Sequence, residues 1–494
     1  MEDWHLSKKD LKNYPHFDRI ISEQRAEAYA TDADAVAKHA FFPFIQYKQR
    51  WRRFRKPGEK RDVKVRPIRY AARRDAYIFL FYRFILSKFY EAELARLDLC
   101  GSVLAYRQIP LPAGKGGKCN IHFAYDAIRK IKELGKCSAI SLDISAFFES
   151  LDHDRLKRVW CRMLGVTRLP PDHFNVFKAI TKYAWVDKEA AYERLGHFGE
   201  KPSKDGRTIQ KGYTTPYHKV PKQLCDAAEF RRKIAGWGDL ASIIKRNDKT
   251  FGIPQGAPIS DILANLYLLD FDDAVAGRAK QRGGAYFRYS DDILIVIPGD
   301  QDAGETLMSE VCELIRRFGP ELKIKDKKTS LITFRQVGER QTFLLNRGTQ
   351  GRNGLEYLGF RYDGTKVFLR DATLSSLRRK VARAARRDAE ACARRYPDKN
   401  LQQLKTLFNY ERLIKKFGRV EEFDATDHNY RNWTFWTYAR RASQVFGPLG
   451  RAILSQLRKH RQQIRQRADK ALERAAAKRD QRKRALKHQC DHQL

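Results

Sequence analysis

Short apolar runs that end or begin at charged turns stand out in the middle of the chain. Residues 138–142 form a β-type run that ends at Asp143. A second apolar run, residues 293–297, follows the turn-like segment 289–292. Apolar runs of this length between charged turns are typical of strands buried under helices. The pattern therefore predicts two buried strands with carboxylates at their ends.

Other stretches predict the elements around these strands. A short strand is expected at residues 63–68, followed by a long and mostly apolar helix. Residues 259–269 have helical periodicity, and the segment 252–256 before them must be a loop because it holds two glycines and a proline. From about residue 373 onward the pattern turns helical, and residues 458–487 form a highly basic helix candidate.

Charge changes this picture more than composition does. The 494 residues include 98 Lys and Arg against 59 Asp and Glu, a formal charge of +39. The 42% hydrophobic and 12% aromatic content excludes a wholly disordered chain. Basic clusters at 48–74, 201–222 and 378–395 are spread along the chain. This spread favours a long groove that follows a phosphate backbone over one membrane-binding patch.

The same composition gives an expectation for the compartment. No stretch offers about 18 uninterrupted apolar residues, and residues 1–10 lack an apolar signal-peptide core. The eight cysteines are scattered without any CxxC spacing. This pattern disfavours a disulfide framework or a zinc site and fits a reducing compartment. We therefore expect a cytoplasmic protein with no membrane contact.

Asp143 and the adjacent pair Asp291 and Asp292 are the candidate catalytic acids, because each adjoins a predicted strand. Neighbouring carboxylates repel each other unless a cation or solvent offsets the charge. Mg²⁺ prefers hard oxygen ligands, and two such ions about 3.5–4 Å apart stabilise the attacking and leaving oxygens of a phosphoryl transfer. Two adjacent aspartates taken alone more often belong to a surface turn, so a catalytic role depends on the surrounding motifs.

Four motifs together resemble those of reverse transcriptases, in the order of that family. Residues 141–152 resemble the first catalytic motif, and residues 289–292 resemble the YxDD turn. Residues 252–260, with Asn265 beyond them, resemble the nucleotide-site loop and helix, and residues 355–360 resemble the primer-grip hairpin. The resemblance covers roughly residues 60–370.

Upstream segments are similar to the fingers of bacterial and group II intron enzymes. This similarity rests on Arg66-Pro67-Ile68 with Asp75, and on residues 105–107. Two features depart from the family pattern: residues 69–71 replace a usual Gly-Ile-Pro, and residues 187–250 look like an insertion. The basic part of this insertion fits either backbone contact or a surface loop.

The resemblance implies an α+β fold, namely a right-hand polymerase with fingers and a palm. The palm sheet would carry helices on one face, and a helical thumb and helical C-terminal extension would follow. Three parts are expected: an N-terminal helical extension at 1–60, fingers and palm at 61–370 including the insertion at 187–250, and the helical thumb with a basic C-terminal region at 371–494.

The resemblance also implies a two-metal site. Asp143 and Asp291 would bind both ions, Asp292 would complete the site, and the main-chain carbonyl of Ile144 would supply a further ligand. The expected cofactor is two Mg²⁺ ions, with Mn²⁺ as a substitute.

Further roles are implied for the substrate pocket. Phe148 would be the steric gate against a ribose 2′-OH, with Phe147 in the core, although the reverse assignment stays open. Gln255 would line the nucleotide pocket. Arg66, with Arg73 or Arg74, would hold the triphosphate, because guanidinium groups form forked bonds with phosphate. Lys328 would protonate the departing pyrophosphate. Structural explanations also exist: Gln255 holding its loop, Arg66 as a solvated charge, and Lys328 touching only backbone phosphate.

The implied function is RNA-directed DNA synthesis from dNTPs. The chain is most similar to the defence-associated and abortive-infection antiphage enzymes, with retron enzymes as relatives. The expected partner is a structured non-coding RNA that serves as template, with DNA as product and homo-oligomerisation as a second association. Two alternatives stay open: template-independent or protein-primed synthesis by the same site, and a catalytically inert assembly protein that binds nucleic acid.

Two C-terminal segments carry alternative interpretations. The aromatic residues of 430–438 could stack on unpaired bases, although a helix buried in a core has the same spacing and is favoured. In residues 458–487 only Ala471, Leu472, Ala475 and Ala476 form an apolar strip. Such a helix is marginal alone, so we expect it to pair with another protomer or, preferably, to lie along RNA; a frayed tail is the remaining explanation.

Overall fold

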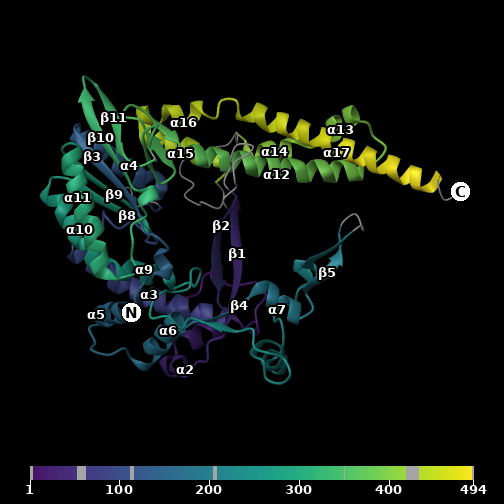
Figure 1. The fold of residues 1–494 in the computed structure, drawn as a ribbon, viewed down its shortest axis with the longest axis horizontal. Helices are drawn as coiled ribbons and strands as arrows, with labels where there is room; N and C mark the ends of the chain where they lie inside the picture. The colour runs from purple at the N-terminus through teal and green to yellow at the C-terminus, as the bar shows by residue number, and fades with distance from the viewer. Residues whose placement is uncertain are drawn as a thin grey trace.

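The computed structural model describes residues 4–52, 63–111, 116–203, 208–349, 351–418 and 433–491. These residues form a central sheet, an N-terminal sheet and a long helical arm (Figure 1). This arrangement confirms the expected α+β class, with a helical region after the sheets. Among the described residues, no helix has both the length and the apolar character needed to cross a membrane.

The central sheet has five strands in the order β11-β10-β3-β9-β8, and all neighbouring strands are antiparallel. Two hairpins, β8–β9 and β10–β11, therefore flank β3, which comes first in the chain. The predicted strands at 138–142 and 293–297 are confirmed as β3 and β9. The bounds are β3 (Cys137–Asp143), β8 (Ala285–Tyr289), β9 (Asp292–Pro298), β10 (Ser330–Val337) and β11 (Arg340–Arg347).

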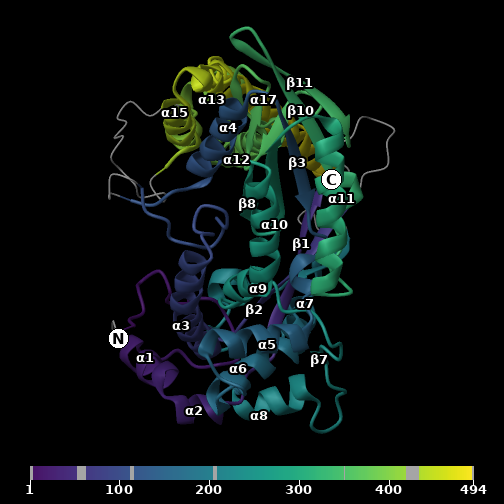
Figure 2. The same cartoon turned by 90° about the vertical axis from the view of Figure 1, so that its left-hand side faces the viewer.

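Both faces of this sheet are covered. Ile140 and Ile295 pack with α10 (Leu269–Gln281) and α11 (Gln301–Leu314) on one face, whereas Ala139 and Val296 pack with α4 (Asn120–Leu134) on the other. Figure 2 shows α4 and α11 on opposite sides of β3. The expectation of helices on one face is wrong, because successive residues of β3 and β9 are apolar and a strand points them to opposite faces.

The N-terminal sheet has the order β2-β1-β4-β7. Strands β1 and β2 pair antiparallel from Ile45–Tyr70 to Arg52–Val63, so a boundary at residue 60 would separate two paired strands. The expected N-terminal extension at 1–60 is therefore corrected: its last strand belongs with the following part. The bounds are β1 (Phe44–Arg52), β2 (Val63–Tyr70), β4 (Ala184–Asp187) and β7 (Lys245–Arg246), with α3 (Arg73–Arg96) after β2.

Parts of the segment 187–250 pack into a core, whereas most described residues of its basic part, 201–222, are exposed. Its Ala191, Leu224 and Ile234 share a third apolar core with Phe17 and Ile45. The insertion therefore packs between the N-terminal residues and the N-terminal sheet. Its elements are α7 (Lys188–Arg194), β5 (Phe198–Pro202), β6 (Ile209–Tyr213), α8 (Ala227–Glu229), a π-helical turn (Phe230–Ala235) and β7.

A small three-stranded sheet connects the central sheet to the helical arm. Strands β12 (Leu355–Tyr357) and β13 (Phe360–Tyr362) form the expected hairpin, and β14 (Val367–Leu369) completes the sheet. The arm then consists of α12 (Asp371–Arg395), α13 (Leu401–Leu407), α14 (Tyr410–Phe417), α15 (Phe435–Phe446), α16 (Arg451–Ser455) and α17 (His460–Asp491). In Figure 1, α12 and α17 extend side by side away from the central sheet.

Helix α17 packs on α12 of the same chain. Its Ile464, Ala468 and Leu472 are buried in one core with Ala385 and Ala389 of α12. Small side chains let the two helices approach closely, so the strip buries enough surface to order the helix. Packing on α12 therefore orders α17 without another protomer or RNA, and contact of its basic side chains with RNA stays a prediction.

The aromatic residues before and in α15 pack against the same core. Phe435, Trp436 and Tyr438 are partly buried on it, and the Tyr438 ring stacks on Phe360 with 6.1 Å between centroids. The favoured interpretation, a helix built into a core, is confirmed for these residues, whereas residues 430–432 lie outside the described part. The remaining helices are α1 (Glu23–Thr31), α2 (Ala33–Ala37), α5 (His153–Leu164), α6 (Pro171–Thr181) and α9 (Ser260–Tyr267).

Candidate active site

Three aspartates meet at one end of the central sheet. Asp143, the last residue of β3, lies directly opposite Asp292, the first residue of β9. Tyr289 of β8 also faces Asp292, so Ser290 and Asp291 form a two-residue turn between β8 and β9. The Ile144 amide donates to the Asp291 carbonyl at 3.0 Å and joins this turn to the end of β3. The structure therefore brings together the acids that the sequence predicted.

The turn has a strained backbone that its neighbours stabilise. Ser290 has φ +60°, a conformation that favours glycine or asparagine and costs other residues about 1–3 kcal/mol. The Tyr106 hydroxyl is 3.0 Å from the Ser290 Oγ, and the Arg288 guanidinium donates to the Ser290 carbonyl at 3.2 Å. Tyr106 itself has φ +65°. These contacts hold the turn in one conformation at the end of the sheet.

A buried ion pair lies beneath the turn. Arg288 of β8 makes two bonds of 2.6 Å to the Asp272 carboxylate of α10, and both side chains are fully buried. Burial alone lowers the pKa of Arg288, but the Asp272 charge and hydrogen bonds outweigh it and raise this pKa above its ordinary value. Arg288 also donates to the Asn265 side chain at 3.1 Å, and Asn265 donates to the Ala105 carbonyl at 3.0 Å. The network joins α9, α10, β8 and the segment around Tyr106.

Lys328 lies in contact with the first aspartate. It ends a short 3₁₀ helix (Asp326–Lys328), and its ammonium group pairs with the Asp143 carboxylate. The Lys325 amide donates to the Asp143 carbonyl at 2.8 Å, and the Ser145 amide donates to the Lys323 carbonyl at 2.8 Å. The segment 323–328 is therefore fastened along the end of β3, which places Lys328 at the site.

Burial and the neighbouring carboxylates together shift the pKa of Asp292. Although its side chain reaches solvent, burial by surrounding atoms and the charges of Asp291 and Asp143 raise the pKa of Asp292 to about 6. Lys328 and Arg370 act in the opposite direction. A cation placed among these acids would relieve the repulsion, which is the electrostatic setting of a divalent metal site.

The donor chemistry of this end of the sheet fits Mg²⁺. Carboxylate oxygens from β3 and the β8–β9 turn are the hard ligands that the ion prefers. Among the residues that the structure describes, no three His, Cys, Asp or Glu side chains are already converged on one point. Instead the Lys328 ammonium neutralises Asp143. Ligation by Asp143, Asp291, Asp292 and the Ile144 carbonyl stays a prediction.

The loop 252–256 joins the predicted nucleotide pocket to the N-terminal sheet. The Ile253 amide donates to the Phe148 carbonyl at 2.7 Å, and the Arg69 amide of β2 donates to the Gln255 carbonyl at 2.9 Å. Gly256 has φ +114°, and a Cβ there would lie 2.5 Å from the Arg69 carbonyl. Only glycine permits this close approach, so Gln255 is held between β2 and the 3₁₀ helix that contains Phe148.

Burial separates the two phenylalanines after Asp143. Phe147 is 3% exposed and belongs to the core, whereas Phe148 is only partly buried. Their rings lie 5.7 Å apart at an interplanar angle of 51°. This difference agrees with the assignment of Phe147 to the core and leaves Phe148 accessible; its role as a steric gate stays a prediction.

Lys64 is a site residue that the sequence interpretation missed. Burial lowers the pKa of Lys64, and the charges of Arg66, Lys328 and Lys325 lower it further, whereas Asp143 raises it. Lys64 of β2 therefore lies near enough to Asp143, Lys325 and Lys328 for their charges to act on it. Lys64 and Arg66 are two residues apart in β2 and share one face of the strand. This alternation of basic residues was the signal in the sequence.

Arg73 does not belong to the phosphate-binding set. Its buried guanidinium donates to the main-chain carbonyls of Tyr14 and Lys222 at 2.7 and 2.8 Å and pairs with Asp18 at 3.3 Å. The proposed triphosphate contact of Arg73 is therefore wrong, because its donors bind the N-terminal segment to the insertion. Arg74 lies over the Tyr29 ring, 4.9 Å from the centroid, on the same side of the fold.

Comparison with known proteins gives a match for part of this chain. Residues 230–362 match the family model described as "Reverse transcriptase (RNA-dependent DNA polymerase)". This segment carries the reverse transcriptase pattern. It includes the loop at 252–256, the turn at 289–292 and the β12–β13 hairpin. Asp143 lies outside it, and the pairing of β3 with β9 supplies this acid.

Telomerase proteins are among those similar to this chain. The telomerase reverse transcriptase of Oryzias latipes is 26% identical over 202 residues, which are 36% of this chain and 18% of that protein. The chain therefore spans less than a fifth of that relative. Two structures of apo telomerase from Candida tropicalis show weak similarity to this chain. The form truncated from the C-terminal domain has 10% sequence identity and a TM-score of 0.32, and the alignment covers 66% of this chain and 57% of that one. The other has 12% identity and a TM-score of 0.34, with 89% and 64% covered. Neither score carries an argument about the fold, which rests on the strand order above.

Removal of the Asp272 charge should loosen the site from below. In Asp272→Asn the buried Arg288 loses its counter-charge, and we expect a loss of roughly 3–5 kcal/mol in the free energy of unfolding. Urea unfolding followed by tryptophan fluorescence measures it. Asp273→Asn, at the exposed neighbouring position, is the control and should change stability by less than about 0.5 kcal/mol. Equal midpoints for the two variants would contradict a supporting role for the pair.

Proposed function

We propose that this chain is an RNA-directed DNA polymerase that adds dNMP to a 3′-hydroxyl. The observation that carries the proposal is the register that sets Asp143 opposite Asp292, with Asp291 bonded through its carbonyl to Ile144. The reverse transcriptase match over residues 230–362 supports it, because that segment supplies two of these three acids.

The proposed metal ligands are Asp143, Asp291, Asp292 and the main-chain carbonyl of Ile144, with two Mg²⁺ ions or Mn²⁺ as substitute. When bound, such ions stabilise the attacking and leaving oxygens of an in-line phosphoryl transfer. The chain's own contribution is to hold three carboxylates close together despite their repulsion. The pairing of β3 with β9 and the Arg288–Asp272 ion pair hold these carboxylates in place.

The basic residues have separate proposed roles. Lys64 and Arg66 of β2 bind the triphosphate, with Gln255 lining the pocket from the loop. Lys328 donates a proton to the departing pyrophosphate. Its contact with the Asp143 carboxylate supports this role, because it places the ammonium group beside the proposed metal ligands.

Neutralising Asp143 or Asp291 should strongly reduce synthesis. We expect Asp143→Asn and Asp291→Asn each to lower dNMP incorporation by about three orders of magnitude, since several kcal/mol of transition-state stabilisation are lost. Incorporation of labelled dNMP on an RNA template with Mg²⁺ measures this, and circular dichroism checks the fold. Asp273→Asn should retain full activity. Normal activity of either site variant would refute the assignment.

Phe148 is proposed to exclude ribonucleotides, because a ring against the sugar leaves no room for a 2′-hydroxyl. Phe148→Val should raise rNMP incorporation relative to dNMP by roughly 10–100-fold, the range that one pocket contact usually provides. Phe148→Tyr retains the ring and is the matched control. The ratio is measured with each nucleotide in single-turnover reactions. If both variants keep the original preference, another residue discriminates between the sugars.

We further propose that the template is a structured non-coding RNA and that the enzyme acts in antiphage defence in the cytoplasm. Support comes from the charge of +39 and from the helical arm that follows the polymerase region. Bacteria that express the chain with its flanking RNA should resist phage, and Asp291→Asn should remove the resistance because defence requires the DNA product. Plaque counts measure it. Undiminished protection by Asp291→Asn would favour an inert assembly protein instead.

A further inference from the structure

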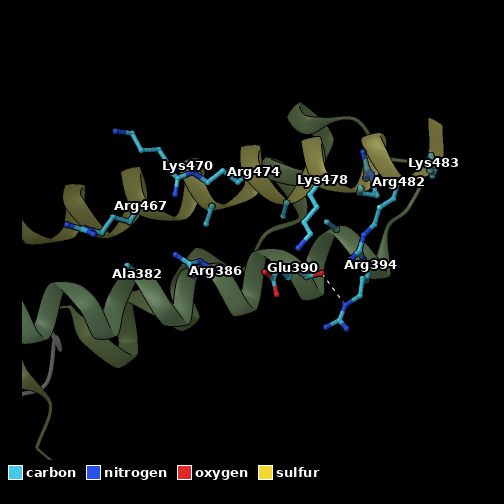
Figure 3. A pocket seen from close by; sticks show the side chains of 14 residues that line it. Ala382, Arg386, Glu390, Arg394, Arg467, Lys470, Arg474, Lys478, Arg482 and Lys483 are labelled. Atoms are coloured by element: carbon cyan, nitrogen blue, oxygen red, sulfur yellow. Dashed lines mark hydrogen bonds between the residues drawn. The ribbon is translucent and has the colours of Figure 1, made fainter. Parts of the chain in front are cut away.

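A basic groove lies between α12 and α17 in the outer part of the helical arm (Figure 3). Its volume is about 600 Å³, and nine cationic side chains but a single carboxylate, Glu390, line it. We call it the arm groove. In Figure 3, Arg386 points from α12 towards α17, and Lys478 of α17 points towards α12. The groove is thus a concentration of positive charge built from two helices.

Small residues make this groove. Ala382 and Ala393 of α12 and Ala471 and Ala475 of α17 line it, so the helices leave a channel where larger side chains would fill the space. On α17 the cationic positions recur every three or four residues and therefore follow one face. They run from Arg467 to Arg482, a span of about 22 Å at 1.5 Å per residue.

Three of the nine cations of the arm groove have hydrogen-bond partners, and one of them, Arg394, donates to the Glu390 carbonyl at 3.3 Å. At the outer end, Arg479 donates to the Tyr396 and Lys399 carbonyls at 3.1 and 2.9 Å, and Lys483 pairs with Asp398 at 2.9 Å. These bonds fasten α17 to the loop after α12. Within the described part of the chain, six other lining cations have neither a hydrogen bond nor an ion pair: Arg386, Arg467, Lys470, Arg474, Lys478 and Arg482.

This distribution favours an extended polyanion. Like charges held this close repel one another, and an anionic polymer that neutralises them also releases its counterions. A membrane surface fits less well, because the channel offers alanines and no large apolar side chain for insertion.

We propose that the arm groove binds a single strand of RNA through its phosphate backbone, outside the polymerase site. The choice of RNA rests on the proposed function: RNA-directed synthesis needs its template before any DNA exists, so RNA is the polyanion present from the start. Figure 1 shows the outer ends of α12 and α17 far from the central sheet. The arm groove therefore holds a part of the RNA that is not being copied.

Salt-dependent binding tests the contact. The full chain is titrated into a labelled 20-nucleotide single-stranded RNA at several salt concentrations. Arg474→Gln/Lys478→Gln should weaken binding about tenfold and reduce the slope of log K against log salt by about 1.4, since each lost phosphate contact accounts for about 0.7. Arg383→Gln/Arg465→Gln removes two exposed charges from the same helices outside the groove and should leave the slope unchanged. Equal slopes for the two double variants overturn the proposal.

Cross-linking in cells identifies the occupant. Glu390→p-azidophenylalanine places a photoreactive group in the arm groove, and Gln466→p-azidophenylalanine places one on an exposed position of α17 outside it. After irradiation, the Glu390 variant should give an adduct that ribonuclease removes, and the Gln466 variant should give far less. A deoxyribonuclease-sensitive adduct, a protein adduct, a lipid adduct or no adduct would each overturn the assignment to RNA.

The readouts are independent of catalysis. An RNA adduct in a protein that incorporates no dNMP would refute the proposed polymerase function while supporting the arm groove. Normal incorporation without a groove adduct would refute the arm groove while leaving the polymerase proposal intact.

Discussion

A slip of one residue between β3 and β9 would separate Asp143 from Asp292 and turn the side chains of the slipped strand to the opposite face, so this register constrains everything at the site. Two apolar cores protect it, because Ile140 and Ile295 pack on one side and Ala139 and Val296 on the other. When both faces are buried, a slip exposes no polar face to water but mismatches side-chain volumes on both sides. Tight packing therefore determines where the carboxylates lie.

Positive side chains from outside the central sheet offset the negative charge at its end. Burial and the charges of Asp291 and Asp143 raise the pKa of Asp292, whereas Lys328, in the segment beside β3, and Arg370 lower it. Beneath the turn, the Arg288–Asp272 pair is fully buried, where an unpaired charge would be costly. The same interaction that stabilises the core thus fixes the backbone of the turn. Rigidity of this kind suits a site that must hold like charges in place.

In the helical arm, the residues that pack the helices together differ from those that carry the positive charge. Helix α17 is ordered by an alanine and leucine strip that packs on α12, which leaves its arginines and lysines outside the contact. The insertion at 187–250 shows a related division, since its own apolar core packs on Phe17 and Ile45 while basic residues stay at the surface. Much of the net charge of +39 can therefore face a polyanion without loss of the packed structure.

The sequence by itself determined the local elements and the chemistry of the acids. The elements next to Asp143 and Asp291 follow from apolar runs of a few residues, and the loop at 252–256 follows from its glycines. Such short-range patterns can be recognised in the sequence without knowledge of the fold. Only the tertiary structure decided which distant groups meet. Arg73 donates hydrogen bonds to the carbonyls of Tyr14 and Lys222, and α17 packs on α12. These partners are distant in the sequence, so local periodicity cannot predict them. Lys64 became a site residue for the same reason: its strand approaches the aspartates only after the chain has folded.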